Sequence, residues 1–239
     1  MRINCTALVV HTVDISPIRS PQAVHSFLAS RFAGHDVVEL GTRNGDGMAC
    51  FAQVARSAFA CEYDAQYCQK LRERATTLPK RFEVVCSDFR QSKLDGDHIT
   101  WWFGQNGPGN MDVLNILRAQ VARGSIRSHA EAVILFDLAD GRYASAFTQP
   151  DRESWERLRR TAAWTQQIKY DERADCNARL HTIFPHKKTG ELLRRGVSCE
   201  RAAGTFMVAG FALNGSLQAQ GHRGVAAVHS IRPHRNTAH

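Results

Sequence analysis

An apolar run that leads directly into three closely spaced glycines constrains this chain more than any other feature. The run is Val37–Leu40, and the glycines are Gly41, Gly45 and Gly47. The run predicts a buried parallel strand, and the glycines predict a tight turn, because glycine adopts positive φ and lets a backbone approach a ligand closely. Residues 48–55 predict a helix whose free N–H groups face the same turn. Together these elements indicate a small-ligand site at the carboxyl end of a parallel strand.

Further apolar runs alternate with helical segments along the chain. Such alternation is typical of βαβ units, so it predicts an α/β fold with a mainly parallel sheet. A cap at Ser20 followed by Pro21 predicts a helix that ends near Phe32. The other predicted strands are residues 58–62, 82–86, 99–103 and 132–137, and the other predicted helices are residues 64–75, 111–122 and 151–164.

Acids follow two of the predicted strands. Glu62 ends the strand after the glycine turn, and Asp88 follows the next one. A carboxylate at the first position has the geometry to accept two hydrogen bonds from a ribose diol. Each acid is also a possible helix N-cap, and that structural role stays open for either residue taken alone.

The order of acid and glycines separates two kinds of nucleotide site. A dinucleotide fingerprint is G-x-G-x-x-G, whereas this chain has Glu39 followed by G-x-x-x-G-x-G. That pattern resembles motif I of the class I S-adenosylmethionine (SAM) dependent methyltransferases, and the resemblance covers about residues 20 to 140. It implies a Rossmann-like methyltransferase fold with a mainly parallel seven-stranded sheet, helices on both faces and an antiparallel edge hairpin. Residues 178–184 and 205–213 are the strands expected to form that hairpin.

The same resemblance implies SAM as the cofactor. By position, the acid after the third strand would meet the adenine amino group, and the residue beside it would pack on the ring. The expected cofactor-binding residues are Glu39, Gly41, Thr42, Asn44, Gly45, Glu62, Tyr63, Asp88 and Phe89.

Residues on the acceptor side are expected after the fourth strand, where Trp102, Gln105 and Asn106 are the candidates. The sequence there is not the (D/N)-P-P-(Y/F) of enzymes that methylate exocyclic or amide nitrogens. Neither Gln105 nor Asn106 is a base at neutral pH, and a core position for Trp102 is an equal alternative. His98, His129 and His181 are only nominal candidates for a base, so the acceptor and the catalytic residues stay open.

Charge is distributed unevenly along the chain, and this indicates possible functions other than methyl transfer. Residues 151–239 carry 15 Lys and Arg against 8 Asp and Glu. A basic half of this kind fits an anionic partner, so a non-catalytic scaffold that binds RNA or an acidic protein is the alternative to a methyltransferase. An aminopropyl transferase is a third possibility. We expect residues 1–19 to form a strand or arm, residues 20–214 the methyltransferase-like domain, and residues 215–239 a basic, flexible tail.

Cysteine usage and hydropathy bear on the setting of the protein. The seven cysteines include no C-x-x-C pair, and Cys61 and Cys86 fall in predicted strands, where a free thiol acts as a small hydrophobe. This favours a reduced, intracellular and cytoplasmic protein without a metal site. No apolar stretch approaches the roughly 20 residues that span a bilayer, and the N-terminus is a poor signal peptide.

Overall fold

A computed structural model describes residues 4–5, 20–103, 107–137, 149–174, 176, 180, 203–214 and 229–230 of the 239-residue chain. Helices and strands alternate through most of it, as the sequence predicts. The helices are α1 (Gln22–Phe32), α2 (Asp46–Phe51), α3 (Ala65–Thr76), α4 (Gly107–Ala122) and α5 (Gln149–Arg159). The strands are β1 (Asp36–Leu40), β2 (Ser57–Glu62), β3 (Glu83–Cys86), β4 (His98–Trp102), β5 (Glu131–Asp137), β6 (Trp164–Asp171), β7 (Ala203–Ala212) and β8 (His229–Ser230).

The strands form a single mixed sheet in the order β3-β2-β1-β4-β5-β7-β6-β8. The first five strands in this order are parallel. Strand β7 runs antiparallel to both β5 and β6, which gives the expected antiparallel pair near the edge. The predicted mixed α/β fold is therefore confirmed, and the two-residue β8 adds a short parallel contact to β6.

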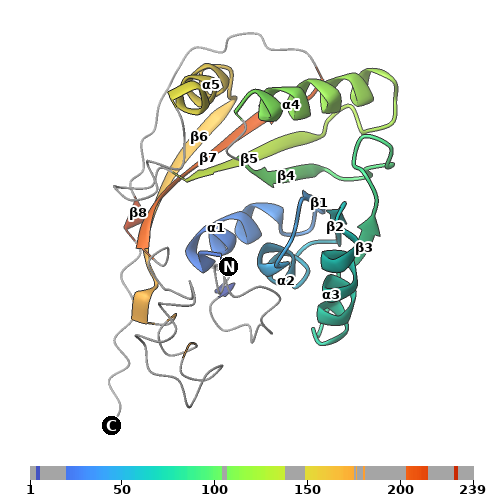
Figure 1. Ribbon diagram of the computed structural model, residues 1–239, viewed down its shortest axis with the longest axis vertical. Helices are drawn as coiled ribbons and strands as arrows, with labels where there is room; N and C mark the ends of the chain where they lie inside the picture. Colours follow the sequence, from blue (N-terminus) through green and yellow to red (C-terminus); the bar gives the residue numbers. More distant parts are fainter. Residues whose placement is uncertain are drawn as a thin grey trace.

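Helices cover both faces of the sheet (Figure 1). Helices α1, α2 and α3 pack on one face, where Phe32, Phe51 and Val133 belong to a buried cluster. Helices α4 and α5 pack on the other face, where the ring of Trp155 stacks on that of Phe136 with centroids 4.5 Å apart. Apolar faces buried on both sides explain why the parallel strands are nearly continuous hydrophobic runs in the sequence.

The predicted antiparallel partner of the last long strand was wrong. Of residues 178–184 the structure describes only Leu180, which is helical. The partner is β6, which starts at Trp164, inside the segment predicted as the end of a helix. The reason is periodicity: alternate residues of β6, among them Ile168 and Tyr170, are buried, and period-two burial is the mark of a strand.

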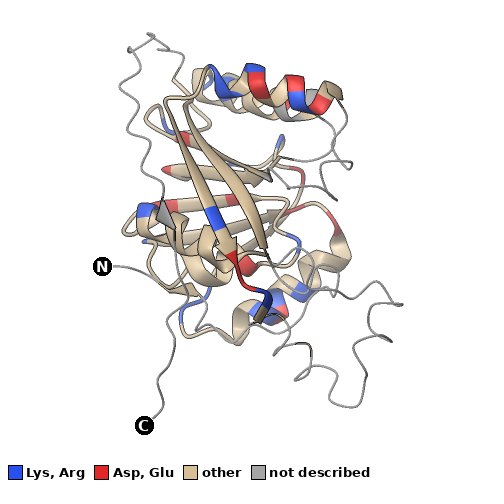
Figure 2. Ribbon diagram, turned by 90° about the vertical axis from the view of Figure 1, so that its left-hand side faces the viewer, with Lys and Arg blue, Asp and Glu red and all other residues tan. Residues whose placement is uncertain are grey.

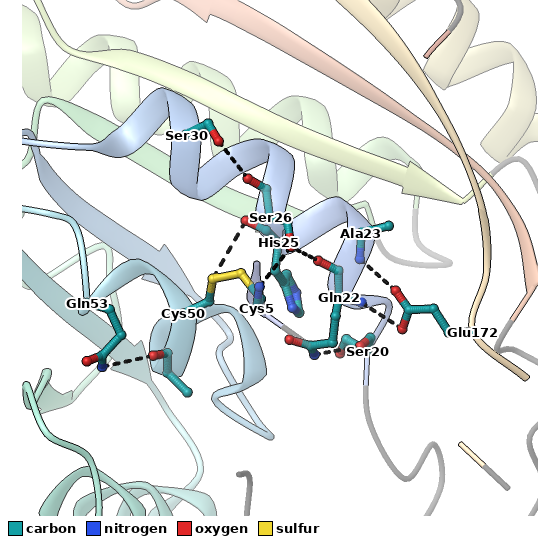
Figure 3. Close-up of a disulfide and its surroundings, with 11 residues drawn as sticks. Cys5, Ser20, Gln22, Ala23, His25, Ser26, Ser30, Cys50, Gln53 and Glu172 are labelled. Carbon is teal, nitrogen blue, oxygen red and sulfur yellow. Dashed lines mark hydrogen bonds between the residues drawn. A yellow bond between two sulfur atoms is a disulfide. The ribbon is translucent and has the colours of Figure 1, made fainter. Parts of the chain in front are cut away.

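Helix α1 begins as expected but is capped differently. Pro21 rather than Ser20 is the N-cap, and no side-chain cap bond comes from it. The carboxylate of Glu172, which follows β6, accepts hydrogen bonds from the backbone N–H groups of Gln22 at 2.9 Å and Ala23 at 2.6 Å (Figure 3). A carboxylate at a helix N-terminus satisfies free donors and complements the helix dipole.

Disulfides correct the expectation of a reduced protein. Cys5 is bonded to Cys50 of α2, with Cα atoms 5.4 Å apart (Figure 3). Cys86, expected as a free thiol, is bonded to Cys68 of α3, with Cα atoms 5.7 Å apart. Cys61 is free and buried, as predicted. The sequence spacing gave no sign of these pairs because each joins elements that only the fold brings together.

The Cys68–Cys86 disulfide should contribute measurably to stability. It joins residues 18 positions apart, and closing a loop of about that length stabilises a fold by about 3 kcal/mol. We expect the double variant Cys68→Ser/Cys86→Ser to lose about that amount of unfolding free energy in urea under oxidising conditions. With reductant present, the variant and the wild type should converge. Equal stability of the two proteins without reductant would contradict a structural role for this bond.

Candidate cofactor site

The glycine turn between β1 and α2 has the backbone conformation that its sequence predicts. Gly41 has φ 64°, and a Cβ added there would meet no atom within 4 Å, so positive φ rather than crowding demands glycine. Gly45, also in the left-handed region, is the N-cap of α2. The turn is closed from inside, because Thr42 donates its hydroxyl to the Glu39 carbonyl at 3.0 Å. Thr42 and Asn44 are buried, whereas Gly41 is exposed. The turn therefore offers backbone, rather than these two side chains, to a ligand.

Glu39 lies buried beneath this turn. Its carboxyl group is so close to α2 that a Cβ on Gly47 would lie 2.8 Å from Oε1. The indole of Trp102 hydrogen-bonds the carboxyl group, but Oε2 has no hydrogen-bond partner in the described part of the chain. Burial, and then the charge of Asp46, raise the pKa of Glu39 to about 8. Glu39 is therefore mostly protonated at neutral pH.

A buried ion pair fixes the shape of the turn from the side of α3. Nη2 of Arg74 lies 2.8 Å from Oδ1 of Asp46, and both side chains are 2% exposed. Arg74 also donates to the carbonyl of Asn44, and Oδ2 of Asp46 accepts from the backbone N–H of Ser20 at 2.6 Å. The pair thus joins α3, the turn and the start of α1. One sequence signal indicates that Arg74 lies on the buried side of α3. It is three residues after Leu71 and four before Leu78, and both leucines are buried.

Glu62 lies beside the turn at the end of β2. Its carboxylate accepts three backbone N–H bonds, from Arg43 and Tyr63 at 2.9 Å each and from Asp64 at 3.0 Å. A carboxylate has about four lone-pair positions, so one position on Oε2 remains for a further donor. The sequence predicts two hydrogen bonds from a ribose diol to Glu62, whereas the structure leaves an acceptor position for one. Tyr63, the next residue, is 80% exposed.

Asp88 and Phe89 follow β3, the strand next to β2. Glu62 and Cys86 are aligned across the two strands, so the acids lie at the same carboxyl edge of the sheet. Phe89 is partly buried against the core, and Asp88 is paired with Arg90. Cofactor candidates from three strand ends therefore gather at one edge.

Of the three candidates for the acceptor side, the structure describes only Trp102. The ring of Trp102 packs edge-on against those of His25 and Phe206, with centroids 5.9 Å and 5.0 Å apart, so it is largely a core residue. Gln105, Asn106 and His181 lie outside the described residues.

The two described histidines proposed as bases lie at the other end of the sheet. His98 begins β4 and contacts Glu131, whereas His129 precedes β5 and contacts Asp97. Both are therefore far along the strands from the carboxyl edge, so the structure does not bring either nominal candidate to the cofactor candidates.

Charges in the described C-terminal half are mixed. Basic and acidic residues are interspersed along α5 (Figure 2), which carries Asp151, Arg152, Glu153, Glu156, Arg157 and Arg159. No three His, Cys, Asp or Glu residues in the described ranges are grouped to hold a metal ion. Among the same residues, every helix is too short or too polar to cross a membrane.

Protonation of Glu39 should appear in the pH dependence of stability. Its folded pKa of about 8 lies above the ordinary 4.5, so the folded state keeps a proton that the unfolded state loses between these values. Stability of the wild type relative to Glu39→Gln should therefore fall as pH rises through this window. Urea unfolding across it, with the exposed Glu73→Gln as control, measures the difference. A difference that is flat or rises with pH would contradict the assignment.

Removing Arg74 should leave Asp46 as an uncompensated buried charge. We expect Arg74→Ala to lower the free energy of unfolding by about 3–5 kcal/mol. The matched control is Arg72→Ala, an exposed position on the same helix, which should change stability by no more than about 0.5 kcal/mol. Chemical denaturation of both variants tests this, and equal effects at the two positions would contradict the structural role of the pair.

Comparison with solved structures identifies the fold. A proposed RNA methyltransferase from Pyrococcus horikoshii matches with TM-score 0.51 and 14% identity, over 81% of this chain and 85% of the other. A SAM-dependent methyltransferase from Thiobacillus denitrificans, solved with S-adenosyl-L-homocysteine, matches with TM-score 0.49 and 13% identity over 86% and 95%. A dimethyladenosine transferase from Plasmodium falciparum matches with TM-score 0.46 and 14% identity over 81% and 62%.

The sequence itself matches no protein-family model and no curated protein. The likeness to the Pyrococcus horikoshii structure is therefore one of fold. The chain has the Rossmann-like fold of the class I SAM-dependent methyltransferases.

Proposed function

We propose that this protein transfers a methyl group from SAM to an acceptor. The observation that carries the proposal is Glu62, whose carboxylate is oriented by three backbone N–H groups and keeps one lone pair beside an open glycine turn. A buried acid held in this way suits a ribose hydroxyl, because a charged acceptor forms a strong and directional hydrogen bond. If Glu62 were only a helix N-cap, the open turn and the exposed Tyr63 beside it would have no explanation.

The residues around the turn fit the chemistry of SAM. Glu62 would accept from one ribose hydroxyl, and Tyr63 and Phe89 would offer apolar surface to the purine. Asp88 would accept from the adenine amino group. Glu39, with its unpartnered buried Oε2, would accept a hydrogen bond from the ammonium group of the cofactor beneath the turn. Gly41, Thr42, Asn44 and Gly45 would contact the cofactor through their backbone.

When bound, the cofactor supplies a methyl group on a sulfonium sulfur. An acceptor nucleophile would take this methyl carbon as its bond to sulfur breaks, with the electron pair left on sulfur. The protein's part in such a displacement is to hold the reactants in line and to exclude water. Trp102, Gln105 and Asn106 remain the proposed contacts to the acceptor. No residue of the protein is assigned as a base. The nucleophile of the acceptor would therefore need only to be positioned, or the acceptor would carry its own base.

Calorimetric titration tests the proposal directly. We expect micromolar binding of SAM and of S-adenosylhomocysteine, and no binding of NAD, because the glycine order is that of a SAM site rather than a dinucleotide site. Binding of NAD alone would contradict the proposal. Binding of none of the three would favour the RNA-binding scaffold, whose affinity should fall steeply with salt.

Substitution of Glu62 should weaken cofactor binding. A hydrogen bond to a charged group contributes roughly 1.5–3 kcal/mol, so Glu62→Ala should raise the Kd for S-adenosylhomocysteine by about 10- to 150-fold. Glu62→Gln keeps an acceptor oxygen and should have a smaller effect. Exposed Glu73→Ala on α3 is the matched control and should leave the Kd unchanged. Unchanged affinity of Glu62→Ala, with melting temperature preserved, would contradict the proposed ribose contact.

A further inference from the structure

The carboxylate of Asp88 already accepts hydrogen bonds from the backbone and the side chain of one neighbouring residue, Arg90. Arg90 donates its backbone N–H to Oδ1 at 2.9 Å, and its Nε lies 2.9 Å from Oδ1 and 2.8 Å from Oδ2. Nη2 of Arg90 also bonds Oδ2. These contacts use the lone-pair positions of both oxygens, so no acceptor position is left for another donor.

The guanidinium of Arg90 also lies near Tyr63. Hydrogen bonds to Asp88 raise the pKa of Arg90, and the electrostatic interaction with Tyr63 acts in the same direction. Arg90 itself is largely exposed, whereas the Asp88 side chain is only 14% exposed. The cation therefore lies against Asp88 and near Tyr63, two of the residues proposed to surround the purine.

A guanidinium resembles the amino edge of adenine in the features that matter here. It is planar, it donates N–H bonds along one edge to a carboxylate, and it stacks on aromatic rings. Asp88, Tyr63 and Phe89 present a carboxylate and two aromatic rings at this edge of the sheet, so they can recognise either group.

We propose that Arg90 is an internal competitor of the adenine ring: it occupies Asp88 in the free protein and must leave before the adenine amino group binds. This inference rests on the proposed SAM site. Release of Arg90 from Asp88 costs little free energy, because an ion pair with one exposed partner shifts an equilibrium by about fivefold at most. Arg90 thus lowers cofactor affinity modestly, and it disfavours nucleosides that lack an amino group able to replace its bonds to Asp88.

The chain offers a matched control for this experiment. Arg173 forms the same kind of pair with Asp171, two residues before it, through its backbone N–H at 3.2 Å and Nε at 2.9 Å. That pair follows β6 and is not part of the proposed site. The variants Arg90→Ala and Arg173→Ala therefore remove equivalent exposed cations, and only the first frees a proposed cofactor contact.

We expect Arg90→Ala to bind S-adenosylhomocysteine about two- to fivefold more tightly than the wild type by calorimetry at about 50 mM salt. Arg173→Ala should match the wild type. The gain should shrink at about 500 mM salt, because salt weakens the Asp88–Arg90 pair of the wild type. Arg90→Lys keeps the charge without the forked geometry, so its affinity should lie between the two.

The outcomes separate this inference from the proposed function. Equal or weaker binding by Arg90→Ala, while the wild type binds, overturns the competitor role and leaves the SAM site standing. Binding by Arg90→Ala but not by the wild type supports the inference. Failure of both proteins to bind, with melting temperatures unchanged, overturns the proposed function and this inference with it.

Discussion

A single buried guanidinium holds the candidate site in shape. Arg74 pairs with Asp46 at 2.8 Å, and this contact joins α3 to the turn after β1, while Asp46 in turn holds the start of α1. Two charges removed from water are tolerated only when their geometry is good and their other bonds are satisfied. In the turn that the pair contacts, Arg43 has φ 44° and directs its N–H to Glu62.

This arrangement places three acids at one edge of the sheet in different chemical states. Glu39 is buried and has a raised pKa, Glu62 is held by backbone donors, and Asp88 is paired with Arg90, which lowers its pKa. Under the proposed function, Glu39, Glu62 and Asp88 would face the amino-acid, ribose and purine parts of the cofactor, respectively.

Most of the parallel half of the fold could be predicted because its signals are local. A few consecutive residues are enough to predict each of these features. The apolar run before Gly41 predicts a buried strand, and the acids that follow β2 and β3 predict the carboxyl ends of those strands. Helix α3 was equally accessible, because Asp64 caps it and accepts from Gln66 and Tyr67, and Leu71 and Ala75 lie on its buried stripe.

The features that escaped prediction depend on contacts between distant segments. Strand β6 was hidden because Trp155 and Leu158 have a helical spacing, and the predicted helix was extended to Trp164 although α5 ends at Arg159. The Cys68–Cys86 bond and the Glu172 cap of α1 both join elements that only the sheet brings together. Arg74 looked like one more charge on a polar helix, and its partner Asp46 lies 28 residues before it.

The most direct measurement is a crystal structure of the protein with S-adenosylhomocysteine. We expect a ribose hydroxyl within hydrogen-bond distance of Oε2 of Glu62, the purine against Tyr63 and Phe89, and the amino-acid part over the turn at Gly41. Ligand bound at another edge of the sheet, with Glu62 free of contact, would contradict the central claim that this turn is a SAM site.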